Sequence, residues 1–152
     1  MKKAEIILAL LALISLLMKL TEIPLGGLLF LFSMLILSLL YYPFGFAFFN
    51  NIRLQDIFKK ESYKGISKGR IFGAIGAGIG LSTVIVGIIF SVMHYPSAGF
   101  NLVMGLVLTI IVLGIALFKN SKQSNEFYHI IFIRIAILGT FGVILLFLQN
   151  WR

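Results

Sequence analysis

The chain has 152 residues, of which 60% are hydrophobic and only 12% are charged, and its formal net charge is +8. A soluble domain carries about twice this charged fraction to cover its surface, so the composition excludes a water-soluble globule and predicts one membrane domain over residues 1–152. The absence of cysteine excludes disulfides, thiolate metal sites and a cysteine nucleophile.

Five apolar stretches predict transmembrane helices at about 6–20, 23–42, 71–93, 102–118 and 130–148. The third exceeds the roughly 17 residues that a span requires, whereas the first reaches it only if Lys19 extends its amine outward and Glu5 lies among headgroups. No stretch alternates with a period of two, as a strand would. The predicted fold class is therefore an all-α, polytopic membrane bundle of about five helices.

Basic residues gather on one predicted side of the membrane. They are Lys2, Lys3, Arg53, Lys59, Lys60, Lys64, Lys68, Arg70, Lys119 and Lys122. The other side has little beyond Lys19 and Arg152, so the positive-inside rule places the N-terminus in the cytoplasm and the C-terminus outside. Basic loops beside apolar runs indicate membrane lipid rather than nucleic acid as the partner.

The basic segment 52–64 is predicted to be a short amphipathic helix in the plane of the interface. Leu54, Ile57 and Phe58 fall at helical spacing, and charged residues occupy the opposite arc. The aromatic run at 41–49 precedes it and suits the headgroup region. An interfacial anchor is favoured here over a partner-binding motif.

A weak internal repeat relates residues 17–37 to residues 89–109 at an offset of 72. It aligns Pro24 with Pro96 and Gly27 with Gly99, and each pair falls in a tight turn between two predicted helices. The repeat predicts two similar helical hairpins followed by one further helix.

Small residues on the third predicted helix follow steps of 3, 4, 3 and 4 and so form one stripe. They are Gly73, Gly76, Gly80, Thr83 and Gly87. Such a stripe lets another backbone approach closely, which predicts tight helix packing. A partner helix within the chain is favoured over one from a second subunit.

Lys19, Glu22, His94 and Arg134 form the candidate ion or partner site. His94 occupies the position of Glu22 in the second turn, so the two could form an ion-binding pair, although residues at helix ends also reach water without any function. Arg134 lies inside the fifth apolar run, where it either reaches the cytoplasmic headgroups or pairs with Glu5, Asp56 or Glu126.

Acidic residues are missing from the interior of every predicted helix, and the two histidines fall on opposite sides of the membrane. Ion pumps need a carboxylate at depth, and a bilayer enzyme needs a nucleophile, base or metal ligands within mutual reach. The sequence therefore predicts no enzyme, no cofactor and no metal site.

The stretch 86–99, VGIIFSVMHYPSAG, with Leu102, Gly105 and Leu106 beyond it, resembles a known hairpin. It is similar to the transmembrane hairpin of the GldL family of gliding-motility motor proteins of Bacteroidota, where a helix ends in an F-K-x-M-H-W-P-G-A turn. The resemblance covers about 35 of the 152 residues. It implies a small protein of the bacterial inner (cytoplasmic) membrane, and in that family the hairpin serves an oligomeric, proton-driven motor. In that membrane, the outside position that the basic residues predict for the C-terminus is the periplasm.

His94 and Lys19 match the family's turn, but other positions depart from it. Ser91 stands where the family has lysine, Glu22 replaces the histidine of the first turn, and segment 102–118 lacks the family's membrane glutamate. The predicted function is therefore a non-catalytic membrane subunit or scaffold that packs with itself or with other membrane proteins. The alternative is an ion-coupled motor or transport subunit.

Overall fold

The computed structural model describes residues 1–122 and 126–150, except the side chains of 120–122 and 150. Its helices are α1 (Lys2–Leu20), α2 (Gly26–Tyr41), α3 (Gly45–Phe49), α4 (Lys68–Val92), α5 (Ala98–Lys122) and α6 (Glu126–Asn150), with 3-10 turns η1 (Leu54–Asp56) and η2 (Lys60–Tyr63). This part of the chain holds no strand, which confirms the all-α prediction. Arg152 and the side chain of Lys122, both used in the topology prediction, lie outside it.

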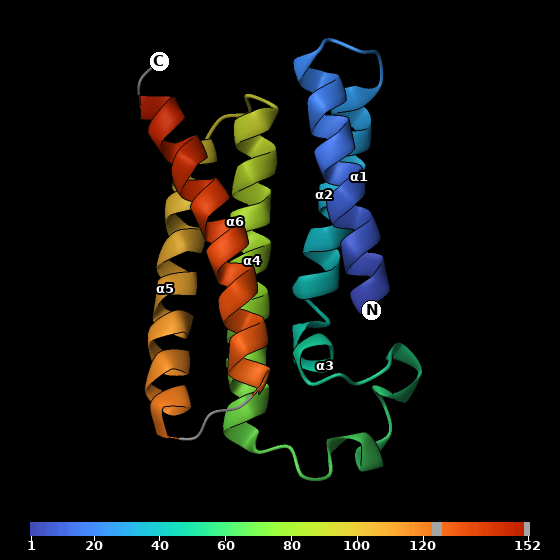
Figure 1. The fold of residues 1–152 in the computed structure, drawn as a ribbon, viewed down its shortest axis with the longest axis vertical. Coiled ribbons are helices and arrows are strands. Elements are labelled where there is room, and N and C mark those ends of the chain that lie inside the picture. The colour runs from blue at the N-terminus through green and yellow to red at the C-terminus, as the bar shows by residue number, and fades with distance from the viewer. Residues whose placement is uncertain (123–125, 151–152) are drawn as a thin grey trace.

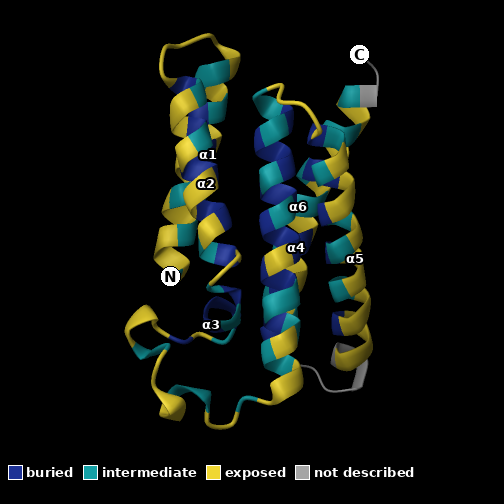
Figure 2. Cartoon of the chain, turned by 180° about the vertical axis from the view of Figure 1, so that it is seen from behind, coloured by how far each residue is buried: buried dark blue, intermediate teal, exposed yellow. Residues whose placement is uncertain are grey.

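Helix α4 is the centre of the bundle (Figure 1). The α1–α2 hairpin packs on one side of it through α2, and α5 and α6 pack on the other side. Ala74, Ala77, Leu81, Ile85 and Ile88 of α4 are completely buried, while the outward faces of α1, α5 and α6 are largely exposed (Figure 2). Most of these exposed side chains are apolar, as expected of a bundle surrounded by lipid.

Three helices, α4, α5 and α6, are long and apolar enough to cross a membrane. Each has 25 residues, or about 37 Å, against a hydrocarbon core of about 30 Å. By contrast, α2 has 16 residues, or about 24 Å, and α1 carries Lys2, Lys3 and Glu5 at its start and Lys19 near its end. Length and composition thus support three spans rather than the predicted count of five.

The predicted amphipathic helix over 52–64 is replaced by the two short turns η1 and η2. Tyr63 folds this segment back by donating a hydrogen bond to the carbonyl of Ile57 at 2.6 Å and by stacking on Phe46. Lys59 bonds Asp56 at 2.8 Å, and this hydrogen bond lowers the pKa of the carboxyl. A helix this short is marginal on its own, so local side-chain bonds decide the conformation instead.

The two hairpin turns have the same geometry at the predicted offset of 72. Glu22 and His94 both have φ of 58°, and Leu25 and Ser97 have φ of 69° and 64°. The closing hydrogen bonds also correspond, since the amides of residues 23 and 95 bond the carbonyls of residues 18 and 90, both at 2.8 Å. This 6→1 bond behind a left-handed residue is a Schellman cap, and it ends α1 and α4 in the same way.

Candidate functional site

A partly buried ion pair joins the first and last helices of the bundle. Arg134 enters α6 among isoleucines, so its guanidinium must find partners within the protein or reach headgroups. Its Nε and Nη2 donate to the two carboxylate oxygens of Glu5 on α1, both at 2.6 Å, and its Nη1 donates to the carbonyl of Ile130 at 3.1 Å. The side chains of Arg134 and Glu5 are only 17% and 13% exposed.

Aromatic residues of α2 and α3 complete this ion-pair cluster. The Tyr41 hydroxyl donates a hydrogen bond to the Glu5 carboxylate, and the Arg134 guanidinium lies 5.1 Å from the centre of the Phe48 ring. Tyr41 is itself held against Phe48 edge-on at 5.5 Å and stacked on Phe49 at 6.0 Å. The cluster therefore ties four helices together, and three donors already occupy the Glu5 carboxylate.

The sequence pattern groups Arg134 with Lys19, Glu22 and His94 as one candidate site, but the structure places Arg134 away from Lys19. Along α1, Lys19 lies about 21 Å from Glu5, at the opposite end of the helix. Glu22 and His94 are exposed, and within residues 1–122 and 126–150 neither side chain makes a hydrogen bond or ion pair. Among the described residues, Glu22 and His94 thus do not form the predicted pair.

The two hairpin turns nevertheless lie close to other parts of the bundle. A Cβ placed on Gly27 would lie 3.8 Å from both Lys19 Cδ and Met93 Cε, so the two turns, opened by Pro24 and Pro96, are neighbours. Gly99 leaves room for Gln149 of α6, whose Oε1 would lie 3.4 Å from a Cβ there. Gln149 also donates to Ser91 Oγ at 2.8 Å, which fastens the end of α6 to α4.

The glycine stripe of α4 packs against α5 over most of its length. A Cβ on Gly87 would lie 2.8 Å from the Leu102 amide nitrogen, and one on Gly80 would lie 3.1 Å from Thr109 Cγ2. A Cβ on Gly76 would lie 3.3 Å from Val112 Cγ2 of α5, and one on Gly105 would lie 2.9 Å from the backbone carbonyl carbon of Thr83. The neighbour of the stripe is thus a helix of the same chain.

Gly73 departs from this pattern because a Cβ there would meet nothing within 4 Å. Gly73 instead lines a pocket between α4, α5 and α6. The prediction of close packing is therefore wrong at this one member of the stripe.

A second contact face of α4 escaped the sequence analysis. A Cβ on Gly78 would lie 2.4 Å from the Tyr41 carbonyl oxygen, and one on Gly45 would lie 2.9 Å from Gly78 Cα. Next to this contact, Ser38 and Ser82 share a buried hydrogen bond of 2.7 Å between α2 and α4. The signal was present, since Ala74, Gly78 and Ser82 recur every four residues on the face opposite the stripe.

The described residues contain no group of three or more histidine or acidic side chains that could hold a metal. Comparison with known proteins gives no match to a family model, to a curated protein or to a solved structure. What this chain does is therefore inferred from its sequence, its packing and its polar contacts.

Proposed function

We propose that this chain is a non-catalytic subunit or scaffold of a membrane, which packs with itself or with other membrane proteins. The observation that carries the proposal is the occupied state of Glu5. It is the one carboxylate among the described residues that lies within the packed helices, and Arg134 and Tyr41 take up both its oxygens. A group held by a bidentate arginine stabilises helix packing and is not open to load an ion from solution.

The unpartnered face of α1 supports the packing role. Ile6, Leu10, Leu13 and Leu17 follow steps of 4, 3 and 4 and are 58%, 54%, 59% and 63% exposed. Apolar side chains at this spacing line the seam of helix pairs and fill the gaps of a facing helix. More than half of each side chain is exposed, and Leu13 also lines the groove between α1, α2 and α6, so this stripe is open to lipid or to another protein.

The proposal includes a five-span topology in a bacterial inner membrane, with the N-terminus in the cytoplasm. The charges of α1 lie at its two ends, where lysine side chains reach headgroups and short spans are tolerated by local thinning. Labelling from the periplasm should modify Ser97→Cys in the second outer turn and spare Ser67→Cys before α4. The reverse pattern contradicts this topology.

The alternative function is an ion-coupled motor or transport subunit. It draws support from the GldL-like turn at residues 86–99 and from the closeness of the two outer turns at Gly27, where Lys19 lies. It requires Glu22 or His94 to exchange a proton, and both side chains are accessible at the outer surface.

Purification in mild detergent and reconstitution separate the two functions. We expect a particle larger than one 16.9-kDa chain, formed by a homo-oligomer or a stoichiometric partner, and no proton flux into proteoliposomes. Leu10→Gln with Leu13→Gln should weaken that assembly, because two glutamines would interrupt the exposed stripe of α1. Proton flux that disappears with Glu22→Gln or His94→Ala would instead establish the ion-coupled function.

A further inference from the structure

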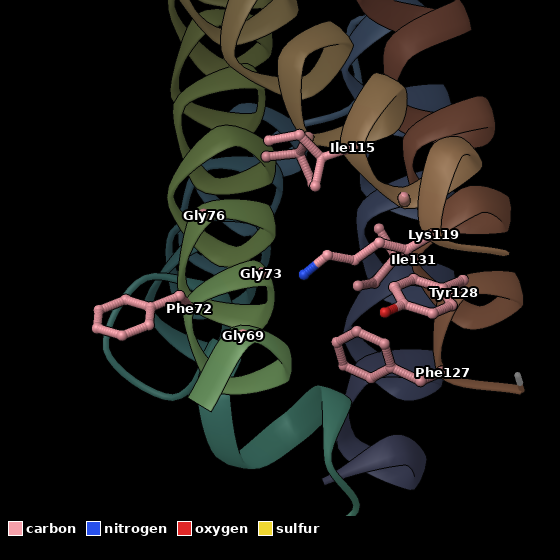
Figure 3. A pocket seen from close by; sticks show the side chains of 11 residues that line it. Gly69, Phe72, Gly73, Gly76, Ile115, Lys119, Phe127, Tyr128 and Ile131 are labelled. Carbon is pink, nitrogen blue, oxygen red and sulfur yellow. The ribbon is translucent and has the colours of Figure 1, made fainter. Parts of the chain in front are cut away.

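A pocket of about 280 Å³ opens between α4, α5 and α6 at the end of the bundle that carries the basic residues (Figure 3). It begins where the glycine stripe loses contact with α5, so Gly73 and Gly76 form one wall. Val112, Ile115 and Ile131 supply apolar walls from α5 and α6. Pockets that enclose a drug-sized ligand have volumes of about 300–1,000 Å³. This smaller pocket therefore suits part of an extended apolar molecule, such as a segment of an acyl chain, rather than a whole ligand.

One cationic group points into this otherwise apolar space. The amine of Lys119 extends from α5 towards α4, and a Cβ on Gly69 would lie 3.0 Å from its Nζ (Figure 3). Throughout residues 1–122 and 126–150, no hydrogen bond or ion pair engages this amine. A lysine that reaches over an apolar pocket without a counter-ion is complementary to a negative group beside an apolar chain.

A second cation lies at the same pocket. The Arg70 guanidinium sits 4.5 Å from the centre of the ring of Phe127, which lines the pocket, and its buried Nε has no hydrogen-bond partner. Lys68 is exposed in the same turn of α4. Acidic residues do not neutralise this corner, since neither Lys119 nor Arg70 is paired with a carboxylate in the described chain.

We propose that this pocket binds one anionic phospholipid. An acyl chain lies between Gly73 of α4 and Val112 of α5, and the phosphate of the headgroup contacts Lys119 and Arg70. Apolar walls at membrane depth select a lipid chain, and the two unpaired cations at the mouth select a negative headgroup. This inference goes beyond the proposed scaffold function. The lipid site lies within one protein chain, so it does not depend on self-association of the protein.

The test is lipid binding to the full chain in a non-ionic detergent, measured by native mass spectrometry. Phosphatidylglycerol and phosphatidylcholine are titrated separately, which compares an anionic with a zwitterionic headgroup on the same chains. We expect one tightly bound phosphatidylglycerol. Lys119→Ala should weaken its binding about fivefold, equivalent to about 1 kcal/mol for one basic residue, while the exposed loop variant Lys64→Ala changes it little.

A second pair of variants tests the part of the pocket that would hold the acyl chain. Gly73→Leu fills the space, and Gly114→Leu adds the same side chain at an equally open position of α5 outside the pocket. We expect Gly73→Leu to abolish the bound lipid and Gly114→Leu to retain it, with both variants melting like the parent protein. Equal binding of the two lipids, equal effects of Lys119→Ala and Lys64→Ala, or lipid retained by Gly73→Leu would each overturn the proposal.

Discussion

Removal of the Glu5 carboxylate is expected to destabilise the bundle more than any exposed substitution on α1. Glu5→Leu leaves the Arg134 guanidinium without the two oxygens that it bonds at 2.6 Å, while the methylene volume of the site is roughly kept. The guanidinium retains the Ile130 carbonyl, the face of Phe48 and the neighbouring Tyr41 side chain, none of which carries a negative charge. Its charge would then be buried without a counter-ion.

The size of this effect follows from the burial of the pair. Breaking a fully buried ion pair by removing one partner costs about 3–5 kcal/mol. Because Arg134 is 17% exposed and keeps one carbonyl, we expect the lower end of that range, about 3 kcal/mol. Glu5→Leu with Arg134→Leu removes both charges and leaves only the Tyr41 hydroxyl without its acceptor, which costs about 1–2 kcal/mol.

The assay is unfolding in mixed micelles of rising dodecyl sulfate content, followed by near-ultraviolet circular dichroism of the packed aromatic residues. The double variant should be more stable than Glu5→Leu by at least about 1 kcal/mol, and adding Tyr41→Phe should recover part of the remaining loss. If Glu5→Leu lowers the free energy of unfolding by less than about 1 kcal/mol, Arg134 reaches the headgroups when Glu5 is removed, and the ion-pair cluster does not stabilise the bundle. A double variant as unstable as the single one leads to the same conclusion.

Three further changes test packing and turn geometry in the same unfolding assay. Gly80→Leu should destabilise by about 2–3 kcal/mol because it forces α4 from α5, whereas Gly114→Leu, in open space, should be neutral. Ser38→Ala should cost about 0.6–1.7 kcal/mol by leaving Ser82 without its interhelical partner, and a neutral result would place water there. Leu25→Gly should raise the free energy of unfolding by about 0.5–1 kcal/mol, because Leu25 has φ of 69°, which glycine adopts without strain, and its side chain is 68% exposed. A lower stability would mean that the Leu25 side chain makes packing contacts.

Helices and turns were predictable from the sequence because their determinants are local. Long apolar runs require helices in lipid, and this places α4, α5 and α6 within a few residues of their observed bounds. The repeat at an offset of 72 rested on the pairs Pro24–Pro96 and Gly27–Gly99, and the turns indeed share their backbone conformation. A helix cap is set by four or five adjacent residues, so such short similarity is sufficient.

The polar cluster was only partly predictable because it depends on how helices are arranged in space. The depth of Arg134 narrowed its partners to Glu5, Asp56 or Glu126, but depth does not say which helix lies opposite. The answer depends on α2, since its contact with Gly78 places α1 where Glu5 reaches α6. The open end of the stripe at Gly73 was not predictable for a similar reason, because residues of α5 and α6 that are distant in sequence form the other walls of that pocket.

The two hairpins have the same turn geometry but differ in the contacts that hold their helices together. In α4–α5, both helices have 25 residues and their backbones meet at Gly80, Gly87 and Gly105. In α1–α2, the helices have 19 and 16 residues, and the close backbone contact lies near the turn, at Gly26. The second hairpin is thus closed by its own seam. The first hairpin is attached to the rest of the bundle by α2 against α4 and by the Glu5–Arg134 pair, and it leaves apolar residues of α1 exposed. Under the proposed scaffold function, those exposed residues are where a partner would bind.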